Sequence, residues 1–446
     1  MYQIAIGDEN SWLVIEGASI AAPFRKAACF FSFGTEKFLK EKIEIQMAGT
    51  PTEITEAISK LEKISLKIDE YKRGEYAHPQ RIRFKKTSGG NYYYLLLSEM
   101  HLAAQKAAYL KELRGSYLVE IIYIRSNHID GDKVELELNG KDGLEIKGGF
   151  DMINHWDNTA ALGNYFYIDP AKFSTDLPAS LRLELENTYG ANKIHDLYFG
   201  IYHHPSYYDH TIFYAFATDM SGGTQYYNAS AINDYYRRII WNSSSWTAVL
   251  NYPAPSADTK KFDGRTYRPI MHLYSSHVYT DLMMRITLKR GSYTLETCDP
   301  IYSDPDFDYV IFPPIQIPPN RILREEDPHH VELEISFLKE DGTIAQIDVD
   351  CLQLLPLDYS ATFKGFYDMG NEEYLIDDCY LGLTNVQIGD ANKFEVVAHQ
   401  RQGGPLLLYP DEYSMIFLII ANENNTQDIL RTSTIKAFYR PRFKTL

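Results

Sequence analysis

The pattern of apolar and polar residues contains one strong helical signal near the start of the chain. Between residues 51 and 73, apolar side chains recur at the three- and four-residue spacing of a single helix face. They are Ile54, Ala57, Ile58, Leu61, Ile64, Ile68 and Tyr71. Thr50, Pro51 and Glu53 form a capping-box sequence with proline at the first helical position. The sequence therefore predicts an amphipathic helix over about 51–73.

Alternating apolar and polar segments flank this helix and predict strands. They cover residues 42–47, 81–86, 91–97 and 117–124. The alanine-rich segment 98–115 lies between the last two and predicts either a second helix or a long arm. A helix that is apolar on one side must cover another element. We therefore expect a first domain over 1–140, in which the helix covers one face or opening of a β-sandwich.

After about residue 140, short alternating strands separated by turns rich in Gly, Pro, Asn and Asp dominate the pattern. These strand signals lie at 180–188, 196–202, 211–218, 269–276, 282–291, 309–317, 330–338, 345–357, 414–421 and 432–443. Many short strands of this kind are typical of sandwiches and jelly rolls. The proline-rich segment 313–330 is either a linker between two sandwiches or one long loop. We therefore expect a mainly β protein. A jelly-roll-like or lectin-like sandwich would cover 141–320, and 321–446 would form a second sandwich or complete the first.

The acidic composition limits the partners of the chain. Its 446 residues carry a formal net charge of −16, whereas nucleic acids and anionic membrane surfaces attract basic proteins.

The first residues lack a secretory pattern, and the longest apolar run, 415–421, is too short to cross a bilayer. The cysteines at 29, 298, 351 and 379 match neither a zinc ribbon nor a disulfide framework. We therefore expect a chain that folds in a reducing cytoplasm, with no cofactor and no membrane insertion.

The stretch IYHHPSYYDHTIFY, residues 201–214, has three possible interpretations. It could be a metal site built from His203, His204, Asp209 and His210, a sugar-stacking surface, or a loop between two strands. Adjacent residues of one strand point to opposite faces, so two neighbouring histidines cannot bind the same metal there. Tyrosine rings suit the apolar faces of sugars, and further aromatic residues follow in GGTQYYN and NDYYRRIIWNSSSW. The loop is the preferred interpretation. The candidate sugar contacts are Tyr202, Tyr207, Tyr208, Trp241 and Trp246.

Two carboxylate clusters are candidates for further chemistry. Asp304, Asp306 and Asp308 alternate in YSDPDFDY and could hold a structural cation, but no glycine or glutamate follows at EF-hand spacing. Asp348 and Asp350 share one strand face and could form an acid/base pair. The glycine-rich nucleotide motifs and the GxSxG nucleophile motif are absent from the sequence. We therefore expect a protein without catalytic residues, and we prefer a solvated loop to a metal site at 304–308.

The order of elements in the first 130 or so residues resembles tail-tube and distal-tail proteins of long-tailed phages and prophages. The matching phrases are KIEIQMAG, TPTEITEAISKLEKISLKIDEYKRG, RIRFKK, NYYYLLLSEM and RGSYLVEIIYIR. The rest resembles lectin-like β-sandwiches appended to such proteins, in FSTDLPASLRLELENT, CLQLLPLD, QGGPLLLYPDEYSMIFLI and KAFYRPRF. The resemblance implies a virion structural protein that forms a homo-oligomeric ring or tube with other tail proteins. DNA would pass through without specific binding, and the outer sandwiches would contact cell-surface carbohydrate.

Two alternatives stay open at this point. The first is a free-standing carbohydrate-binding protein that uses the tyrosines and tryptophans named above. The second is a β-sandwich glycoside hydrolase that uses two carboxylates from Asp306, Asp308, Asp348 and Asp350.

Overall fold

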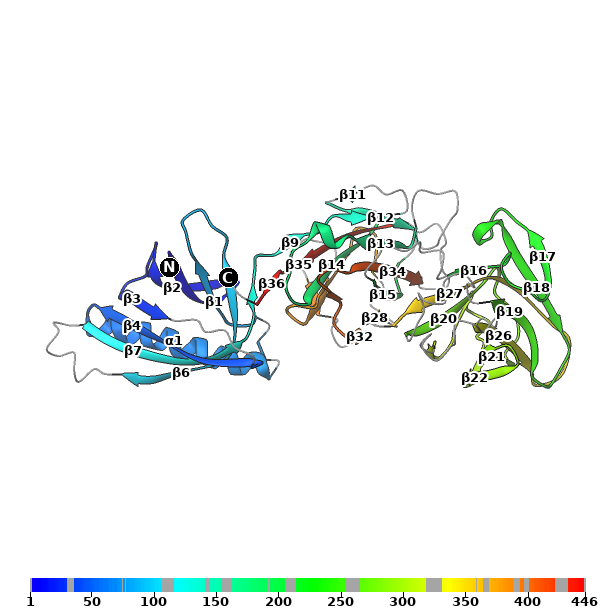
Figure 1. The fold of residues 1–446 in the computed structure, drawn as a ribbon, viewed down its shortest axis with the longest axis horizontal. Helices are drawn as coiled ribbons and strands as arrows, with labels where there is room; N and C mark the ends of the chain where they lie inside the picture. Colours follow the sequence, from blue (N-terminus) through cyan, green and yellow to red (C-terminus); the bar gives the residue numbers. More distant parts are fainter. Residues whose placement is uncertain are drawn as a thin grey trace.

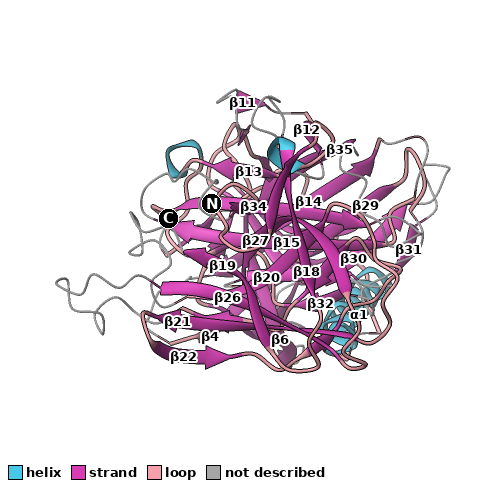
Figure 2. Ribbon diagram, turned by 90° about the vertical axis from the view of Figure 1, so that its right-hand side faces the viewer, coloured by secondary structure: helices cyan, strands magenta, loops and turns pink. Residues whose placement is uncertain are grey.

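The computed structural model is mainly β, which confirms the predicted fold class. Three units follow one another along the long axis of the molecule (Figure 1) and overlie one another when the molecule is viewed from its end (Figure 2). The structure describes residues 2–29, 36–73, 75–76, 78–105, 116–140, 145–146, 148–153, 163–188, 190, 193–204, 214–253, 265–317, 331–357, 359–363, 369–387, 394–396, 401–421 and 432–444. Within these residues, no helix has the length and apolar character needed to cross a membrane.

The first unit is a curved antiparallel sheet with the strand order β2-β1-β5-β6-β7-β4-β3. Its strands are β1 (Gln3–Asp8), β2 (Ser11–Gly17), β3 (Phe24–Cys29), β4 (Phe38–Ala48), β5 (Arg81–Lys85), β6 (Tyr93–Gln105) and β7 (Ser116–Ser126). The short strand β8 (Ile129–Asp130) pairs with β6 and with β36 (Arg442–Phe443). The two end strands of the sheet, β2 and β3, lie close to each other. A hydrogen bond joins them, in which the backbone N–H of Ala27 in β3 donates to the Glu16 carboxylate in β2.

Helix α1 (Pro51–Lys72) confirms the helix prediction in detail. The Thr50 hydroxyl accepts a hydrogen bond from the Glu53 N–H, and the Glu53 carboxylate accepts one from the Thr50 N–H at 2.7 Å. This reciprocal pair satisfies two backbone donors that would otherwise lack partners at the start of the helix. The buried face contains Ile54, Ala57, Leu61, Ile64 and Ile68, and it packs into the core of the curved sheet.

Residues 98–115 were expected to form either a second helix or a long arm, and the helix is wrong in the part that the structure describes. Strand β6 continues through Gln105 and pairs with β7 across two bulges. Residues 106–115 lie outside the described residues. The alanines favour a helix locally, but pairing with a long neighbouring strand outweighs a preference of a few tenths of a kcal/mol per residue.

The second unit is a sandwich of two sheets. One sheet has the order β11-β10-β13-β34-β15-β28-β32, and the other has the order β12-β35-β14-β29-β30-β31, with β9 pairing with β35 and β33 with β14. The strands are β9 (Val134–Glu135), β10 (Leu138–Asn139), β11 (Glu145–Ile146), β12 (Phe150–Ile153), β13 (Tyr165–Ile168), β14 (Ala179–Asn187), β15 (Asp196–His204), β28 (Tyr359–Phe363), β29 (Tyr374–Asp378), β30 (Leu383–Gln387), β31 (Phe394–Val396), β32 (Arg401–Gly403), β33 (Leu407–Leu408), β34 (Tyr413–Ala421) and β35 (Thr432–Tyr439). A short 3-10 helix, η2 (Pro170–Lys172), follows β13.

The third unit is a second sandwich that is inserted between β15 and β28 of the second unit. Its sheets have the orders β17-β18-β27-β20-β24 and β19-β26-β21-β22, with β16 pairing with β27, β25 with β20 and β23 with β21. The strands are β16 (Tyr214–Phe216), β17 (Thr224–Tyr227), β18 (Tyr235–Trp241), β19 (Thr247–Pro253), β20 (Thr266–Leu273), β21 (Leu282–Arg290), β22 (Tyr293–Thr297), β23 (Ile301–Tyr302), β24 (Tyr309–Ile311), β25 (Ile315–Gln316), β26 (Val331–Lys339) and β27 (Ala345–Pro356). The 3-10 helix η4 (Ile232–Asp234) precedes β18.

This strand pairing divides the chain differently from the expected boundaries. Apart from β36, the strands of the first unit end at Asp130, and those of the second unit begin at Val134, whereas the expected boundary lay at 140. The expected boundary at 320 falls inside the third unit, which spans 214–356. The second unit is completed only by strands that follow this insertion, because β15 pairs with both β28 and β34. Local composition carries no information about pairing between such distant segments.

The three units are joined by two kinds of contact. The second and third units share one apolar core, to which Tyr165 and Phe417 contribute from one side and Leu354 and Val349 from the other. The first and second units are joined by polar contacts. The Tyr380 hydroxyl, between β29 and β30 of the second unit, donates to the Asp130 carboxylate of β8 at 2.7 Å, and Nη1 of Arg442 in β36 donates to the Pro178 carbonyl at 3.2 Å.

Candidate functional site

A cleft lies where the second unit meets the third. It has a wide outer part and a narrow inner part that share the residues Asp196, Tyr309 and Ile311. Asp196 is the first residue of β15, and Tyr309 and Ile311 are the ends of β24, so each side of the cleft comes from a different sandwich. Ligand sites are frequently found at such boundaries between packed units.

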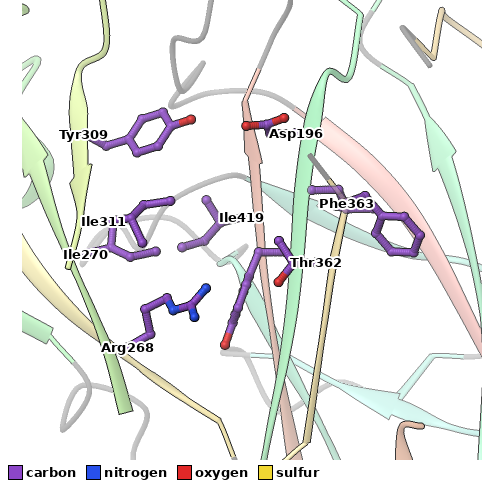
Figure 3. Close-up of a pocket in the computed structure, with 10 residues that line it drawn as sticks. Asp196, Arg268, Ile270, Tyr309, Ile311, Thr362, Phe363 and Ile419 are labelled. Carbon is purple, nitrogen blue, oxygen red and sulfur yellow. The ribbon is translucent and has the colours of Figure 1, made fainter. Parts of the chain in front are cut away.

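The inner part is a narrow apolar slot with a polar group at each end (Figure 3). Ile270, Ile311 and Ile419 line its middle, Asp196 and Tyr309 lie at one end, and Arg268 lies at the other. The Nε of Arg268 is buried and has no hydrogen-bond partner among the described residues. The cavity volume is about 30 Å³, which leaves room for about one water molecule.

The outer part has a cavity volume of about 540 Å³, within the range of small-molecule sites. Tyr302, Phe307 and Tyr309 supply aromatic surface, and His195, Asp196 and Asp304 supply polar groups. The Tyr302 side chain is 58% exposed, and its hydroxyl donates to the Glu340 carboxylate at 2.6 Å. This hydrogen bond holds an exposed ring at the rim of the cleft.

The electrostatics of the cleft are acidic. Burial raises the pKa of the Tyr309 phenol, and the carboxylates of Asp196, Asp308 and Asp304 raise it further. A neutral tyrosine hydroxyl beside carboxylates can exchange hydrogen bonds with a ligand that carries hydroxyl groups. The cleft is therefore suited to a neutral, hydroxyl-rich ligand.

The aspartates considered as weak candidates for cation binding form a turn at the edge of this cleft. The Asp304 carboxylate accepts a hydrogen bond from the Asp306 N–H at 3.0 Å, and the carbonyl of Asp308 accepts one from the Leu273 N–H at 2.7 Å. Across the described residues, no group of three or more His, Cys, Asp or Glu side chains is arranged to hold a metal ion. The turn explains the alternating aspartates, since Asx turns favour aspartate at this position.

The predicted sugar contacts are not brought together. Tyr202 is fully buried and Trp241 is 5% exposed, and both belong to the core shared by the second and third units. Trp246 is half-buried, with the Arg285 guanidinium 4.3 Å from its ring centroid. Tyr207 and Tyr208 lie outside the described residues. The stacking hypothesis is therefore not kept for Tyr202 and Trp241, because a sugar cannot reach a ring inside the core.

The histidine pair of the same stretch also lies in a strand. His203 and His204 are the last two residues of β15, so the pair lies in a strand and not in a turn. The His203 ring is buried, and its Nδ1 lies 3.1 Å from the Ser414 hydroxyl. Burial and the nearby Arg265 guanidinium lower the pKa of His203 to about 3, so this imidazole is neutral. Asp209 and His210 lie outside the described residues.

The predicted acid/base pair on β27 consists of two carboxylates in different surroundings. Both oxygens of Asp348 accept hydrogen bonds from Arg238, each at 2.8 Å. Asp350 is 1% exposed, and its Oδ2 accepts a hydrogen bond from the Ile232 N–H at 3.1 Å. The first carboxylate is neutralised by an ion pair and the second is enclosed, so the two do not face a common cavity.

Sequence reasoning singled out the segments GGTQYYN and NDYYRRIIWNSSSW, but it named none of the exposed tyrosines of the third unit as a candidate contact. Twelve large apolar side chains are exposed among the described residues, and eight of them lie in this unit. These eight are Tyr226, Tyr227, Ile240, Val278, Tyr293, Leu295, Tyr302 and Ile344. Next to Tyr226, the rings of Tyr236 and Tyr274 continue a stack with centroid separations of 5.5 and 4.5 Å. Alternation along QYYN and DYYRR could have placed Tyr226 and Tyr236 on one face, but only the pairing of β17 with β18 makes them neighbours.

No protein-family model matches the sequence, and no curated protein matches it either.

Proposed function

We propose that the chain is a structural component of a phage tail or tail-like particle, with a non-enzymatic role. The first unit would assemble with copies of itself into rings or a tube, and the two sandwiches would extend outward. The observation that carries this proposal is the insertion of the third unit into the second. Insertion places the sandwich with most of the exposed aromatic residues at the end of the molecule opposite the first unit (Figure 1).

The outer face of the first unit supports the assembly part of the proposal. Strands β4 and β7 are each 11 residues long and pair along their whole length. On β7, the half-buried Leu118, Ile122 and Ile124 alternate with fully buried residues of the inner face. Beside them, the Lys42 ammonium lies 3.1 Å from Glu44 and 3.8 Å from Glu120. A long, mixed apolar and charged face of this kind is suited to packing against another copy.

The net charge is consistent with a conduit for nucleic acid. A charge of −16 repels phosphate groups, so DNA could pass without being held.

The assembly proposal predicts that the purified protein forms rings or tubes. The measurement is molar mass by light scattering over a range of concentrations, with negative-stain microscopy of the same samples. Introducing a charge into the outer face with Ile122→Glu should reduce the mass toward that of one chain, whereas the exposed helix change Lys63→Ala should leave it unchanged. A wild-type chain that stays monomeric at every concentration would contradict the proposal.

A second candidate function is carbohydrate binding by a single chain, which the outer cleft favours. Its volume and its combination of aromatic rings with carboxylates are typical of sites for neutral sugars. We expect Tyr302→Ala to weaken binding of a neutral oligosaccharide about tenfold, since loss of one stacked ring removes about 1–2 kcal/mol.

Glycan-array screening followed by titration of the best ligand measures this effect. Tyr293→Ala is the matched control, because Tyr293 is 74% exposed in the same unit and does not line the cleft. If Tyr302→Ala and Tyr293→Ala bind the oligosaccharide with equal affinity, the sugar does not bind in the outer part of the cleft.

A further inference from the structure

The inner slot of the cleft between the two sandwiches has the size and the surface for one small apolar group. Ile270 of β20, Ile311 of β24 and Ile419 of β34 line its middle (Figure 3). These side chains offer no hydrogen bond, whereas a buried water molecule needs about two to four polar partners. The cavity volume of about 30 Å³ equals the space of one water molecule in the liquid, and therefore of about one methyl group. The slot suits a methyl group better than it suits water.

Paired strands hold the walls of the slot in place. Ile270 lies opposite Ile311 in the pairing of β20 with β24, and Ile419 lies opposite Tyr198 in the pairing of β34 with β15. Arg268 closes the far end, where its Nε is enclosed and out of reach of a ligand. Because both walls belong to hydrogen-bonded sheets, the slot is formed before a ligand arrives.

A donor and an acceptor face each other at the mouth of the slot. The Tyr309 side chain is 7% exposed, and its hydroxyl points toward the Asp196 carboxylate (Figure 3). Both residues also line the outer part of the cleft, so a ligand bound there can reach them. Burial and the nearby carboxylates raise the pKa of Tyr309, so its hydroxyl keeps its proton and can donate. A carboxylate accepts several hydrogen bonds, so Asp196 can accept one from a ligand in addition to its contacts within the protein.

An acetamido substituent on a sugar matches this arrangement of groups. Its methyl group is apolar, its carbonyl accepts a hydrogen bond and its N–H donates one, all within a few bonds of one another. A hydroxyl group in the slot would lose its hydration without gaining a partner, which is costly. The methyl group of a deoxy sugar fits the slot but has no donor and acceptor beside it. Of these substituents, the acetamido group is the one that uses both the slot and its mouth.

We propose that the cleft binds an N-acetylhexosamine, with the acetamido methyl group in the isoleucine slot. The Tyr309 hydroxyl donates to the acetamido carbonyl, and the Asp196 carboxylate accepts from the acetamido N–H. The exposed Tyr302 ring at the rim contacts the apolar face of a sugar ring in the outer part. This proposal rests on carbohydrate binding by the cleft and names the class of sugar; it is independent of ring or tube assembly.

The test is isothermal titration calorimetry of the full chain with three disaccharides. They are N,N′-diacetylchitobiose, its N,N′-dipropionyl analogue, and cellobiose, which carries hydroxyl groups in place of the acetamido groups. Diacetylchitobiose should bind about tenfold more tightly than cellobiose, because burial of the methyl group contributes about fourfold and the hydrogen bonds contribute the rest. The dipropionyl analogue should bind about fivefold or more weakly than diacetylchitobiose, because a further methylene group overfills the slot.

Four variants separate the slot from the rest of the cleft. Ile311→Phe should fill the slot and remove the preference for the acetylated sugar while cellobiose binding is unchanged; Ile311 is half-buried at the end of β24, where a larger side chain is tolerated. Tyr309→Phe should weaken binding of diacetylchitobiose up to about tenfold and leave cellobiose unchanged. Tyr302→Ala should weaken binding of both sugars equally. Tyr293→Ala, outside the cleft lining, is the matched control and should bind both as the wild type does.

The outcomes distinguish the sugar class from carbohydrate binding itself. Cellobiose that binds as tightly as diacetylchitobiose would overturn the acetamido assignment, although carbohydrate binding by the cleft would stand if Tyr302→Ala weakens both. A dipropionyl analogue that binds as tightly as the diacetyl sugar, or an unchanged preference in Ile311→Phe, would exclude the slot as the acyl site. If neither disaccharide binds, the carbohydrate function fails and this proposal fails with it. If Ile311→Phe does not fold, the three ligands with the wild type and with Tyr309→Phe still decide the question.

Discussion

Replacing Asp350 with asparagine is expected to remove a strong pH dependence from the stability of the third unit. Burial raises the pKa of Asp350 to about 8, and the hydrogen bond from the Ile232 N–H offsets only part of this effect. The folded chain therefore keeps a proton that the unfolded chain releases above about pH 4. The favourable contribution is complete below pH 4 and is lost as the pH rises toward 8, at about 1.4 kcal/mol per pH unit.

Urea unfolding between pH 4 and pH 8 measures this effect, followed by tryptophan fluorescence, to which the buried Trp241 contributes from the same unit. Asp350→Asn should be close to the wild type near pH 4 and more stable at pH 8, by at most about 5 kcal/mol. Asp306→Asn, at an exposed turn, is the control and should keep the wild-type slope. An unchanged slope in Asp350→Asn would show that this carboxyl does not titrate in the core.

Replacing Arg125 with methionine is expected to destabilise the first unit by about 3–5 kcal/mol. Arg125 is completely buried and binds both oxygens of Glu41, while its Nη1 donates to the Ser126 carbonyl at 2.8 Å. The variant would leave the Glu41 carboxylate buried on the inner face of the sheet without its counter-ion. Thermal and urea unfolding of the variant measure the loss.

The double variant Glu41→Gln, Arg125→Met distinguishes two effects on stability. One is the loss of the whole ion pair, and the other is a buried carboxylate left without its counter-ion. The amide introduced by Glu41→Gln would be neutral and could still accept the hydrogen bond that the Tyr123 hydroxyl now donates to Glu41 at 2.8 Å. We expect the double variant to recover most of the stability that the single variant loses, because replacing a whole buried pair costs far less than breaking it. A double variant as unstable as Arg125→Met would contradict this account.

The parts of the fold that depend on neighbours along the chain could be predicted from the sequence. Helix α1 has its cap, its proline and its apolar face within residues 50–72, so local rules were sufficient. Alternation also located part of the strands after residue 140, such as β14, β21 and β26, but it did not locate others, such as β13, β19 and β29. Residues 98–105 were misassigned because their state depends on pairing with β7, a strand that begins at Ser116. The insertion of the third unit could not be predicted, since it depends on the pairing of β15 with β28 and β34.

The candidate sites were less predictable than the fold for the same reason. The cleft brings Asp196 next to Tyr309, which belongs to another sandwich. The prediction for Tyr202 overlooked that β15 lies in a sheet with both faces covered, so Ile201, Tyr202 and His203 are all buried. The near-continuous apolar run DLYFGIY carried this signal, since strands buried on both faces lose their alternation.

The insertion of the third unit has a consequence for how such proteins can diversify. The strands on either side of the insertion are direct neighbours, with Ile201 opposite Tyr359. A hairpin turn of a few residues could therefore join them and close the second sandwich without the inserted module. Recombination at this single point could exchange the inserted sandwich for another module and leave the first and second units unchanged. The exchange has one constraint, because any replacement must cover the apolar face that includes Tyr165 and Phe417.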